Sequence, residues 1–185
     1  MKIQTYDIAG PVLMTPKCHH DDRGFFVETH NHATFCEALG KEIVFVQDNQ
    51  SLSIKANTLR GLHYQSAPHI QGKLVRCVRG SILDVAVDAR SNSKTYGQHI
   101  KAILSAENGS QLWVPPGFLH AFLTLEPNTE VFYKVTDYYS AECDRNIFWN
   151  DADLNIDWGV SSKDVFLSEK DKNAPPFSQL SQKMM

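Results

Sequence analysis

The sequence KLVRCVRGSILDVAV, residues 73–87, is the stretch that decides the fold. It contains two short runs, 73–78 and 81–87, that are rich in residues with high strand propensity. Arg79-Gly80 separates the two runs and is typical of a tight turn. We therefore predict two strands joined as a β-hairpin.

Similar runs follow at residues 111–114 and 130–136, and the second of these has a period of two. Glycine and proline separate the runs at short intervals, and no linker, repeat or low-complexity segment interrupts them. Many short strands at this spacing are typical of a sandwich or barrel. The predicted fold is all-β, a single antiparallel β-barrel domain over residues 1–185 with a few short helices at its margins.

Two short helices are predicted at those margins. Asn31 is a suitable N-cap for a helix that continues to Glu37 and stops at Gly40. The serine pair at 161–162 is a second candidate cap, for a helix that reaches Leu167.

The composition excludes several classes of protein. Of the 185 residues, 42% are hydrophobic and 21% are charged, which argues against a disordered chain. The formal net charge is −3 without a basic tail, so nucleic acid is not expected as a main partner. No apolar run is long enough to span a membrane. Residues 1–7 lack an apolar signal core, which predicts a cytoplasmic protein.

Cysteine spacing gives no sign of a zinc ribbon or a CxxC redox pair, because no two cysteines are close in the sequence. We expect reduced thiols at all four positions, which are Cys18, Cys36, Cys77 and Cys143.

The segment LRGLHYQ, residues 59–65, carries the first candidate for chemistry. In a regular strand, Arg60 and His63 would lie on opposite faces. A bulge at Gly61 would re-aim the side chains that follow it. His63 is then either a proton-transfer group near neutral pH or a core histidine bonded to the backbone.

The segment PPGFLH, residues 115–120, matches the PxGxxH pattern of the second cupin motif. Of the first cupin motif, the final glycine is present as Gly80, but Lys73 stands where the metal-binding glutamate belongs. Ala67 and His69 stand where the two histidines belong. A protonated lysine cannot ligate a metal, so the pattern favours a barrel that handles anionic intermediates without one.

Tyr133 and Asp171 are two further candidates. Tyr133 shares a strand face with Val131 and Val135 and is expected to point inward, as a core tyrosine or as a proton donor. Asp171 ends the charged run SEKD at 168–171, which is either a solvated helix end or the source of a carboxylate that orients a histidine.

Taken together, these segments resemble the dTDP-4-dehydrorhamnose 3,5-epimerase family. The resemblance extends from about Val12 to Pro175. It is carried by DRGFF (22–26), FVQDN (45–49), LRGLHYQ (59–65), QGKLVR (71–76), DVAVD (84–88), PGFLH (116–120) and Tyr133-Lys134.

The resemblance implies a cupin-type jelly roll and a homodimer to which the N-terminal segment contributes. It implies no cofactor, no metal, and a dTDP-4-keto-6-deoxy sugar substrate that is inverted at carbons 3 and 5. In this reading His63 is the general base, Asp171 orients it, Tyr133 is the acid on the opposite face and Lys73 stabilises the enolate oxygen. The implied substrate-binding residues are Arg23, Glu28, Gln47, Asn49, Arg60, His120, Tyr139, Asp144 and Lys170, of which Tyr139 matches the aromatic that stacks on thymine.

Two departures and three alternatives accompany this reading. Ala121 replaces a common glycine, which predicts a slightly tighter pocket, and Asp144 replaces a common glutamate of longer reach. The alternatives are a mono-epimerase that acts on carbon 3 or carbon 5 only, a metal-dependent cupin that uses His63, His69 and His120, and a non-catalytic sugar-binding barrel.

Overall fold

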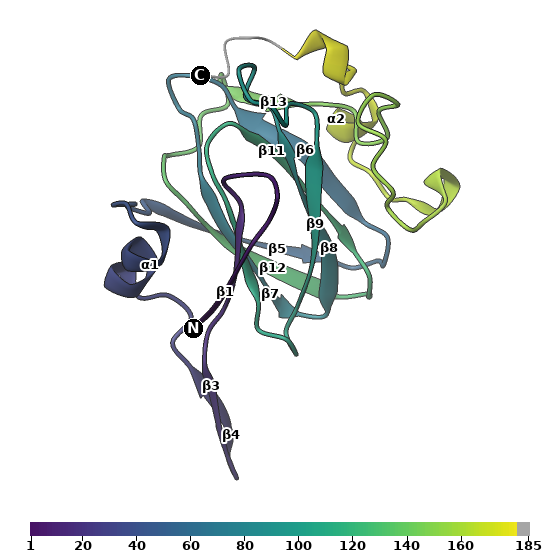
Figure 1. Ribbon diagram of the computed structural model, residues 1–185. Coiled ribbons are helices and arrows are strands. Elements are labelled where there is room, and N and C mark those ends of the chain that lie inside the picture. Colours follow the sequence, from purple (N-terminus) through teal and green to yellow (C-terminus); the bar gives the residue numbers. More distant parts are fainter. Residues whose placement is uncertain (181–185) are drawn as a thin grey trace.

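Two antiparallel sheets form the body of the molecule in the computed structural model, which describes residues 1–180 (Figure 1). In order across the six-stranded sheet lie β1 (Lys2–Thr5), β2 (Val12–Thr15), β10 (Gln111–Val114), β7 (Lys73–Arg79), β12 (Thr129–Val135) and β5 (Gln47–Ser53). The five-stranded sheet contains β13 (Asp144–Asn146), β6 (Leu59–Gln65), β11 (Phe118–Thr124), β8 (Ser81–Asp88) and β9 (His99–Ser105).

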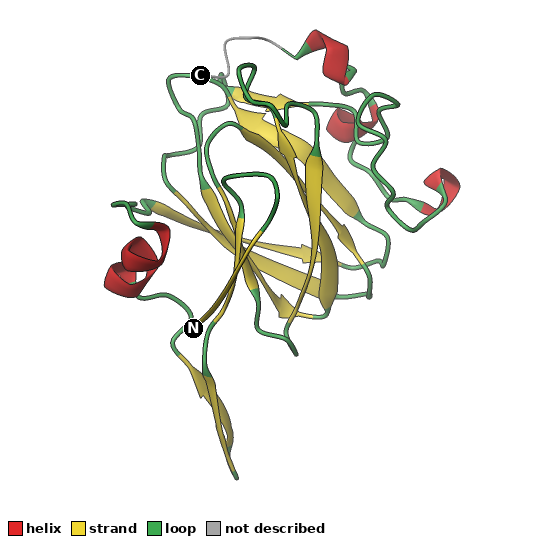
Figure 2. Ribbon diagram, viewed as in Figure 1, coloured by secondary structure: helices red, strands yellow, loops and turns green. Residues whose placement is uncertain are grey.

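The remaining elements are short and lie around these sheets. They are the hairpin of β3 (Cys18–Asp21) and β4 (Gly24–Val27), the helices α1 (His32–Leu39) and α2 (Glu169–Lys172), and two 3-10 turns at Ser162–Asp164 and Phe177–Gln179. Strands dominate and helices stay at the margins (Figure 2). The predicted all-β jelly roll with short peripheral helices is therefore confirmed. The predicted domain also included residues 181–185, which lie outside the described part of the chain.

Apolar side chains from both sheets form one buried cluster. Val75 and Val131 come from the six-stranded sheet, and Ile82 and Phe122 come from the five-stranded sheet. Full burial of such a side chain is worth about 1.5–3 kcal/mol. Tyr133 packs against this cluster, so the site described below lies at the edge of a tightly packed interior.

The C-terminal segment packs against the five-stranded sheet. Leu62 of β6 and Leu119 of β11 share a buried cluster with Trp149 and Phe177. A backbone hydrogen bond of 2.9 Å, from Ile147 N to Leu62 O, fixes the start of this segment. The same segment later forms α2, which contacts β6. A stretch far along the sequence is thereby brought to the strand that carries His63.

The predicted hairpin at Arg79-Gly80 is wrong. β7 pairs with β10 and β12, whereas β8 pairs with β9 and β11, so the turn carries the chain from one sheet to the other. Gly80 has φ 74°, and a Cβ there would overlap Thr129 Oγ1. A glycine of positive φ serves a hairpin and an inter-sheet turn equally well. The turn residues therefore do not identify the partner of each strand.

The first predicted helix is confirmed and the second is wrong. Asn31 Oδ1 accepts a 3.2 Å hydrogen bond from Thr34 N, and α1 ends at Gly40 with φ 64°. The second candidate forms only the 3-10 turn Ser162–Asp164. After that turn Phe166 bonds to the backbone beside β6, through Leu59 N to Phe166 O at 3.0 Å. This pairing replaces the helix that the local pattern favours.

No helix within residues 1–180 has the length and apolar character that crossing a bilayer requires.

Candidate active site

A bulge in β6 brings Arg60 and His63 to the same cavity. In the pairing of β6 with β11, His63 lies opposite His120 and Arg60 lies opposite Phe122, with a shift of register between them. One extra residue in β6 is accommodated there, as the sequence allowed at Gly61. Because the bulge changes the alternation of side chains, Arg60 and His63 both line one cavity.

Gly61 makes this bulge possible, and Gly61→Ala should destabilise the protein. Gly61 has φ 136°, and a Cβ there would overlap the Ala121 side chain and lie 2.7 Å from the His120 carbonyl oxygen. We expect a loss of about 1–3 kcal/mol from overpacking, in addition to backbone strain of about 1–3 kcal/mol. Urea denaturation measures the loss.

The matched control is Gly24→Ala, because Gly24 has φ 128° and no atom lies within 4 Å of the new Cβ. Equal losses of unfolding free energy in the two variants would show that the close approach to Ala121 contributes nothing.

His63 and Asp171 form a hydrogen-bonded pair. His63 Nε2 lies 2.6 Å from Asp171 Oδ1, and Asp171 is 2% exposed. Ser168 caps α2 and donates its hydroxyl to Asp171 Oδ2 at 2.9 Å. Burial raises the pKa of Asp171, but the hydrogen bonds from His63 and Ser168 outweigh it, so the pKa is lowered. An ionised carboxylate therefore holds the imidazole, which leaves Nδ1 to accept a proton.

Lys73 and Tyr133 come from the other sheet. They lie on the neighbouring strands β7 and β12, where Tyr133 is opposite Val75 and Val135 is opposite Lys73. Both side chains line the cavity of about 450 Å³ that also contains His63 and Asp171. The histidine pair and the Lys73–Tyr133 pair therefore enter one cavity from different sheets.

The ionisation of Lys73 and Tyr133 suits a cation and a proton donor. Burial lowers the pKa of Lys73 to about 8, although Asp144 and Asp84 oppose the shift. Burial raises the pKa of Tyr133, so its phenol keeps its proton at neutral pH. Neither Lys73 Nζ nor the Tyr133 hydroxyl makes a hydrogen bond within residues 1–180. Both groups are therefore available to a ligand.

A second cavity of about 190 Å³ adjoins the first and shares His63, Lys73 and Tyr133 with it. Asp144 lies in its wall and accepts hydrogen bonds from Lys170 Nζ at 2.6 Å and from the Tyr139 hydroxyl at 3.3 Å. These contacts hold the shorter Asp144 side chain in the wall. The predicted residues that line this second cavity are Gln47, Asn49, Tyr139, Asp144 and Lys170.

Asp84, which contacts the cavity residue His120, and Ser51, which lines the first cavity, were not predicted from the sequence. Asp84 is completely buried and contacts His120 Nε2 through both carboxylate oxygens, at 2.9 and 3.0 Å. An aspartate within the apolar run 82–87 was a usable signal, because a buried charge requires a partner. Ser51 has a buried hydroxyl with no hydrogen-bond partner among the described residues. Its sequence context gave no such signal.

Arg23 and Glu28 do not join the other predicted residues within one chain. Arg23 lies in the turn of the β3–β4 hairpin, which projects away from the sheets (Figure 1). Its side chain is 90% exposed and pairs with Asp21 at 2.6 Å. Glu28 lines a separate cavity of about 200 Å³, together with Phe35.

The three histidines of the metal-cupin alternative do not converge. His63 pairs with Asp171, His120 pairs with Asp84, and His69 Nδ1 lies 3.2 Å from Asp137. His69 lines neither of the two joined cavities. The geometry therefore does not support a shared metal site for these three side chains.

The predicted effect of Ala121 on the pocket is wrong. Ala121 is completely buried in the cluster that includes Leu62 and Trp149, and it faces Gly61. It does not line either cavity, because the alternation of side chains along β11 places it on the opposite face from His120 and Phe122, which line the first cavity.

Comparison with known proteins finds close relatives over nearly the whole chain. A family model described as dTDP-4-dehydrorhamnose 3,5-epimerase matches residues 5–179. The dTDP-4-dehydrorhamnose 3,5-epimerase of Salmonella typhimurium is 49% identical over 168 residues, which are 91% of each chain.

Solved structures give the same result. The dTDP-6-deoxy-D-glucose-3,5-epimerase of Legionella pneumophila, in complex with dTDP-4-keto-L-rhamnose, superposes with a TM-score of 0.94 at 41% identity, covering 100% of this chain and 96% of that one. A 3′-monoepimerase from Streptomyces bikiniensis, in complex with dTDP-quinovose, has a TM-score of 0.86 at 32% identity, with coverage of 94% and 86%.

Proposed function

The chain belongs to the dTDP-4-dehydrorhamnose 3,5-epimerase family, and from this premise we propose that it inverts carbons 3 and 5 of dTDP-4-dehydro-6-deoxy-D-glucose to give dTDP-4-dehydro-L-rhamnose. The observation that carries the proposal is the arrangement of His63 and Asp171 on one side of a cavity, with Lys73 and Tyr133 entering from the other sheet.

The first step is removal of a proton next to the ketone. His63 takes the proton from carbon 3 or carbon 5, and the electron pair of the broken C–H bond forms the double bond of an enolate. Negative charge moves to the oxygen on carbon 4, where the Lys73 ammonium stabilises it. Charge placed in advance in this way commonly contributes about 3–4 kcal/mol for each donor. Asp171 stabilises the imidazolium that forms.

The second step is return of a proton from the opposite face. Tyr133 donates its phenolic proton to the same carbon, and the enolate returns to the ketone with inverted configuration. The phenolate then takes a proton from solvent and His63 releases one, so the reaction leaves the enzyme unchanged. The same two steps invert the second carbon. All three reacting groups come from the chain, so the reaction as proposed needs no cofactor.

The adjoining cavity suits the nucleotide part of the substrate. Its residues Gln47 and Asn49 supply amide groups, Lys170 supplies positive charge for a diphosphate, and Tyr139 is 59% exposed and offers a stacking surface for thymine. Arg60 and His120 complete the sugar end, since both line the first cavity.

Incubation of the purified protein with dTDP-4-dehydro-6-deoxy-D-glucose tests the proposal. NMR of the product should show inversion at both carbons. Inversion at one carbon only would establish the mono-epimerase alternative. The Streptomyces bikiniensis relative is named as an enzyme of that kind. A protein that binds the sugar nucleotide without converting it would be the non-catalytic barrel, and the proposal would be wrong.

The role of Lys73 predicts a dependence of activity on pH. Because the pKa of Lys73 is lowered to about 8, the ammonium loses its proton as the pH rises above that value. We expect kcat/KM, which reports the free enzyme, to fall above about pH 8. Lys73→Met should lower kcat by about 100- to 1,000-fold, the usual cost of one oxyanion donor.

The matched control is Lys134→Met, because Lys134 lies on β12 and pairs with Asp48 at 2.9 Å. It should leave both the rate and the alkaline limb unchanged. A wild-type rate that stays constant up to pH 10 would contradict the role of Lys73.

A homodimer would give Arg23 and Glu28 a place in the site. Phe25 and Phe26 on the projecting hairpin are 67% and 72% exposed, and a two-stranded hairpin is marginally stable by itself. We therefore propose that the β3–β4 hairpin of one chain contacts the active-site cavity of a second copy of the chain. Analytical ultracentrifugation at micromolar concentration should find a dimer, and a monomer would contradict this assignment.

Mixing two defective variants tests directly whether Arg23 serves the cavity of the partner chain. His63→Ala and Arg23→Glu chains should each be poorly active. A mixed dimer contains one site with intact His63 and an intact Arg23 from the partner chain, so activity should return on mixing. If Arg23 serves its own chain, no activity will return.

The cytoplasmic location expected from the sequence also stays a prediction.

A further inference from the structure

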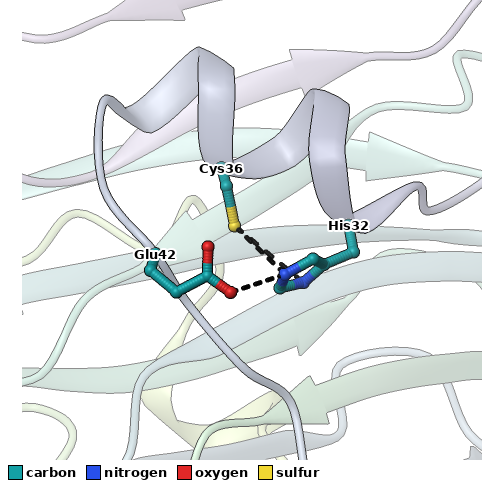
Figure 3. A group of neighbouring side chains, drawn as sticks. All are labelled: His32, Cys36 and Glu42. Atoms are coloured by element: carbon teal, nitrogen blue, oxygen red, sulfur yellow. Dashed lines mark hydrogen bonds and ion pairs between the residues drawn. The ribbon is translucent and has the colours of Figure 1, made fainter.

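The face of α1 carries a group of three different metal-ligand types. His32 and Cys36 lie four residues apart on α1 and therefore project from the same face. Glu42 follows the helix and returns beside them (Figure 3). The ligand atoms of the three residues all lie within 4.8 Å of one another. None of the three lines the joined cavities of the proposed active site.

The backbone fixes this arrangement. Gly40 ends α1 in the left-handed region with φ 64°, and its N–H bonds back into the last turn. Lys41 N donates to Cys36 O at 3.2 Å, which turns the chain back along the helix. Glu42 is thereby held near the middle of α1, so the group does not depend on a flexible loop.

The distances approach those of a tetrahedral zinc site. Zinc holds sulfur at about 2.3 Å and nitrogen or oxygen at about 2.0–2.1 Å, so its ligand atoms lie about 3.3–3.6 Å apart. Cys36 Sγ is 3.8 Å from His32 Nε2, and His32 Nε2 is 2.7 Å from Glu42 Oε1. Small rotations of the exposed His32 and Glu42 side chains, 50% and 70% exposed, would bring both distances into range. Exposed ion pairs contribute little, so opening this one costs little.

The backbone of Ile43 also holds Cys36 Sγ in position. Ile43 N donates a hydrogen bond to Cys36 Sγ at 3.3 Å. Cys36 Sγ donates in return to Ile43 O at 3.7 Å, so two backbone contacts fix the sulfur on the face that carries His32. We propose that His32, Cys36 and Glu42 bind one divalent zinc ion, with water as the fourth ligand. The site takes a borderline-soft cation because it combines a thiolate, an imidazole and a carboxylate.

Titration of the chelator-treated protein with Co²⁺ tests the site, because Co²⁺ occupies zinc sites and reports its ligands in the absorption spectrum. One Co²⁺ per chain should produce tetrahedral bands in the visible range and a thiolate-to-cobalt band in the near ultraviolet, and Zn²⁺ should abolish both. The residues that line the two joined cavities include no cysteine, so the thiolate band cannot come from the proposed active site. The test reads metal binding only and is independent of the proposed reaction.

Single variants identify the ligands. Cys36→Ser should remove the thiolate band, and His32→Ala or Glu42→Gln should weaken binding by at least about tenfold. Cys18→Ser is the matched control, since Cys18 is an exposed thiol outside the group of three ligands, and the variant should bind as the wild type does. A thiolate band that survives Cys36→Ser, a stoichiometry of one metal for two chains, or no saturable binding would each overturn the proposal.

Discussion

His63→Ala should remove nearly all turnover and leave the fold intact. His63 is 32% exposed on its side chain and contributes its ring to a cavity, so its loss creates no gap in the packed interior. A general base contributes about 100- to 10,000-fold to a rate, and the loss should be at least that large. Exchange should be lost at both carbons, because one base serves both.

The matched control is His69→Ala, which breaks another histidine–aspartate pair, with Asp137, outside the two cavities. It should keep the wild-type rate. Proton exchange near the wild-type rate at either carbon in His63→Ala would show that His63 is not the shared base.

Tyr133→Phe should separate proton exchange from inversion. The variant keeps the ring that packs against the buried cluster and loses only the hydroxyl. Because that hydroxyl makes no hydrogen bond within residues 1–180, the free energy of unfolding should fall by no more than about 1 kcal/mol. In deuterated water His63 can still remove a proton and return a deuteron to the same face, which restores the original configuration. Deuterium exchange into the sugar should therefore be faster than inversion.

NMR of the recovered sugar measures both quantities, and Tyr138→Phe, at a side chain 62% exposed, is the control. Inversion of carbon 5 at the normal rate in Tyr133→Phe would contradict its role as the acid. Equal loss of exchange and inversion would instead mean that the hydroxyl binds or polarises the substrate.

Local sequence signals predicted the elements better than their partners. The strand at 111–114 and the helix between Asn31 and Gly40 follow from propensity and capping, which act within a few residues. The turn at Arg79-Gly80 was found, but its strands join different sheets, because strand pairing depends on contacts far along the chain.

Prediction of the site residues was limited in the same way, because local signals do not reveal contacts between distant parts of the chain. His63 and Tyr133 were visible as polar groups in apolar strands, whereas Asp171 belongs to a charged run that resembles a solvated helix end. Its burial results from packing of the C-terminal segment against β6, which no local pattern reveals. Counting cysteines likewise missed the His32–Cys36–Glu42 group, because the chain reversal at Gly40 brings its three different ligand types together.

Deuterium incorporation by the wild-type protein tests the central claim most directly, namely that His63 and Tyr133 act on opposite faces of the same carbons. The substrate is incubated in deuterated water, and carbons 3 and 5 of the product are read by NMR. The account predicts inverted configuration and deuterium at both carbons, with neither change in His63→Ala. Inversion without deuterium, or exchange confined to one carbon, would contradict it.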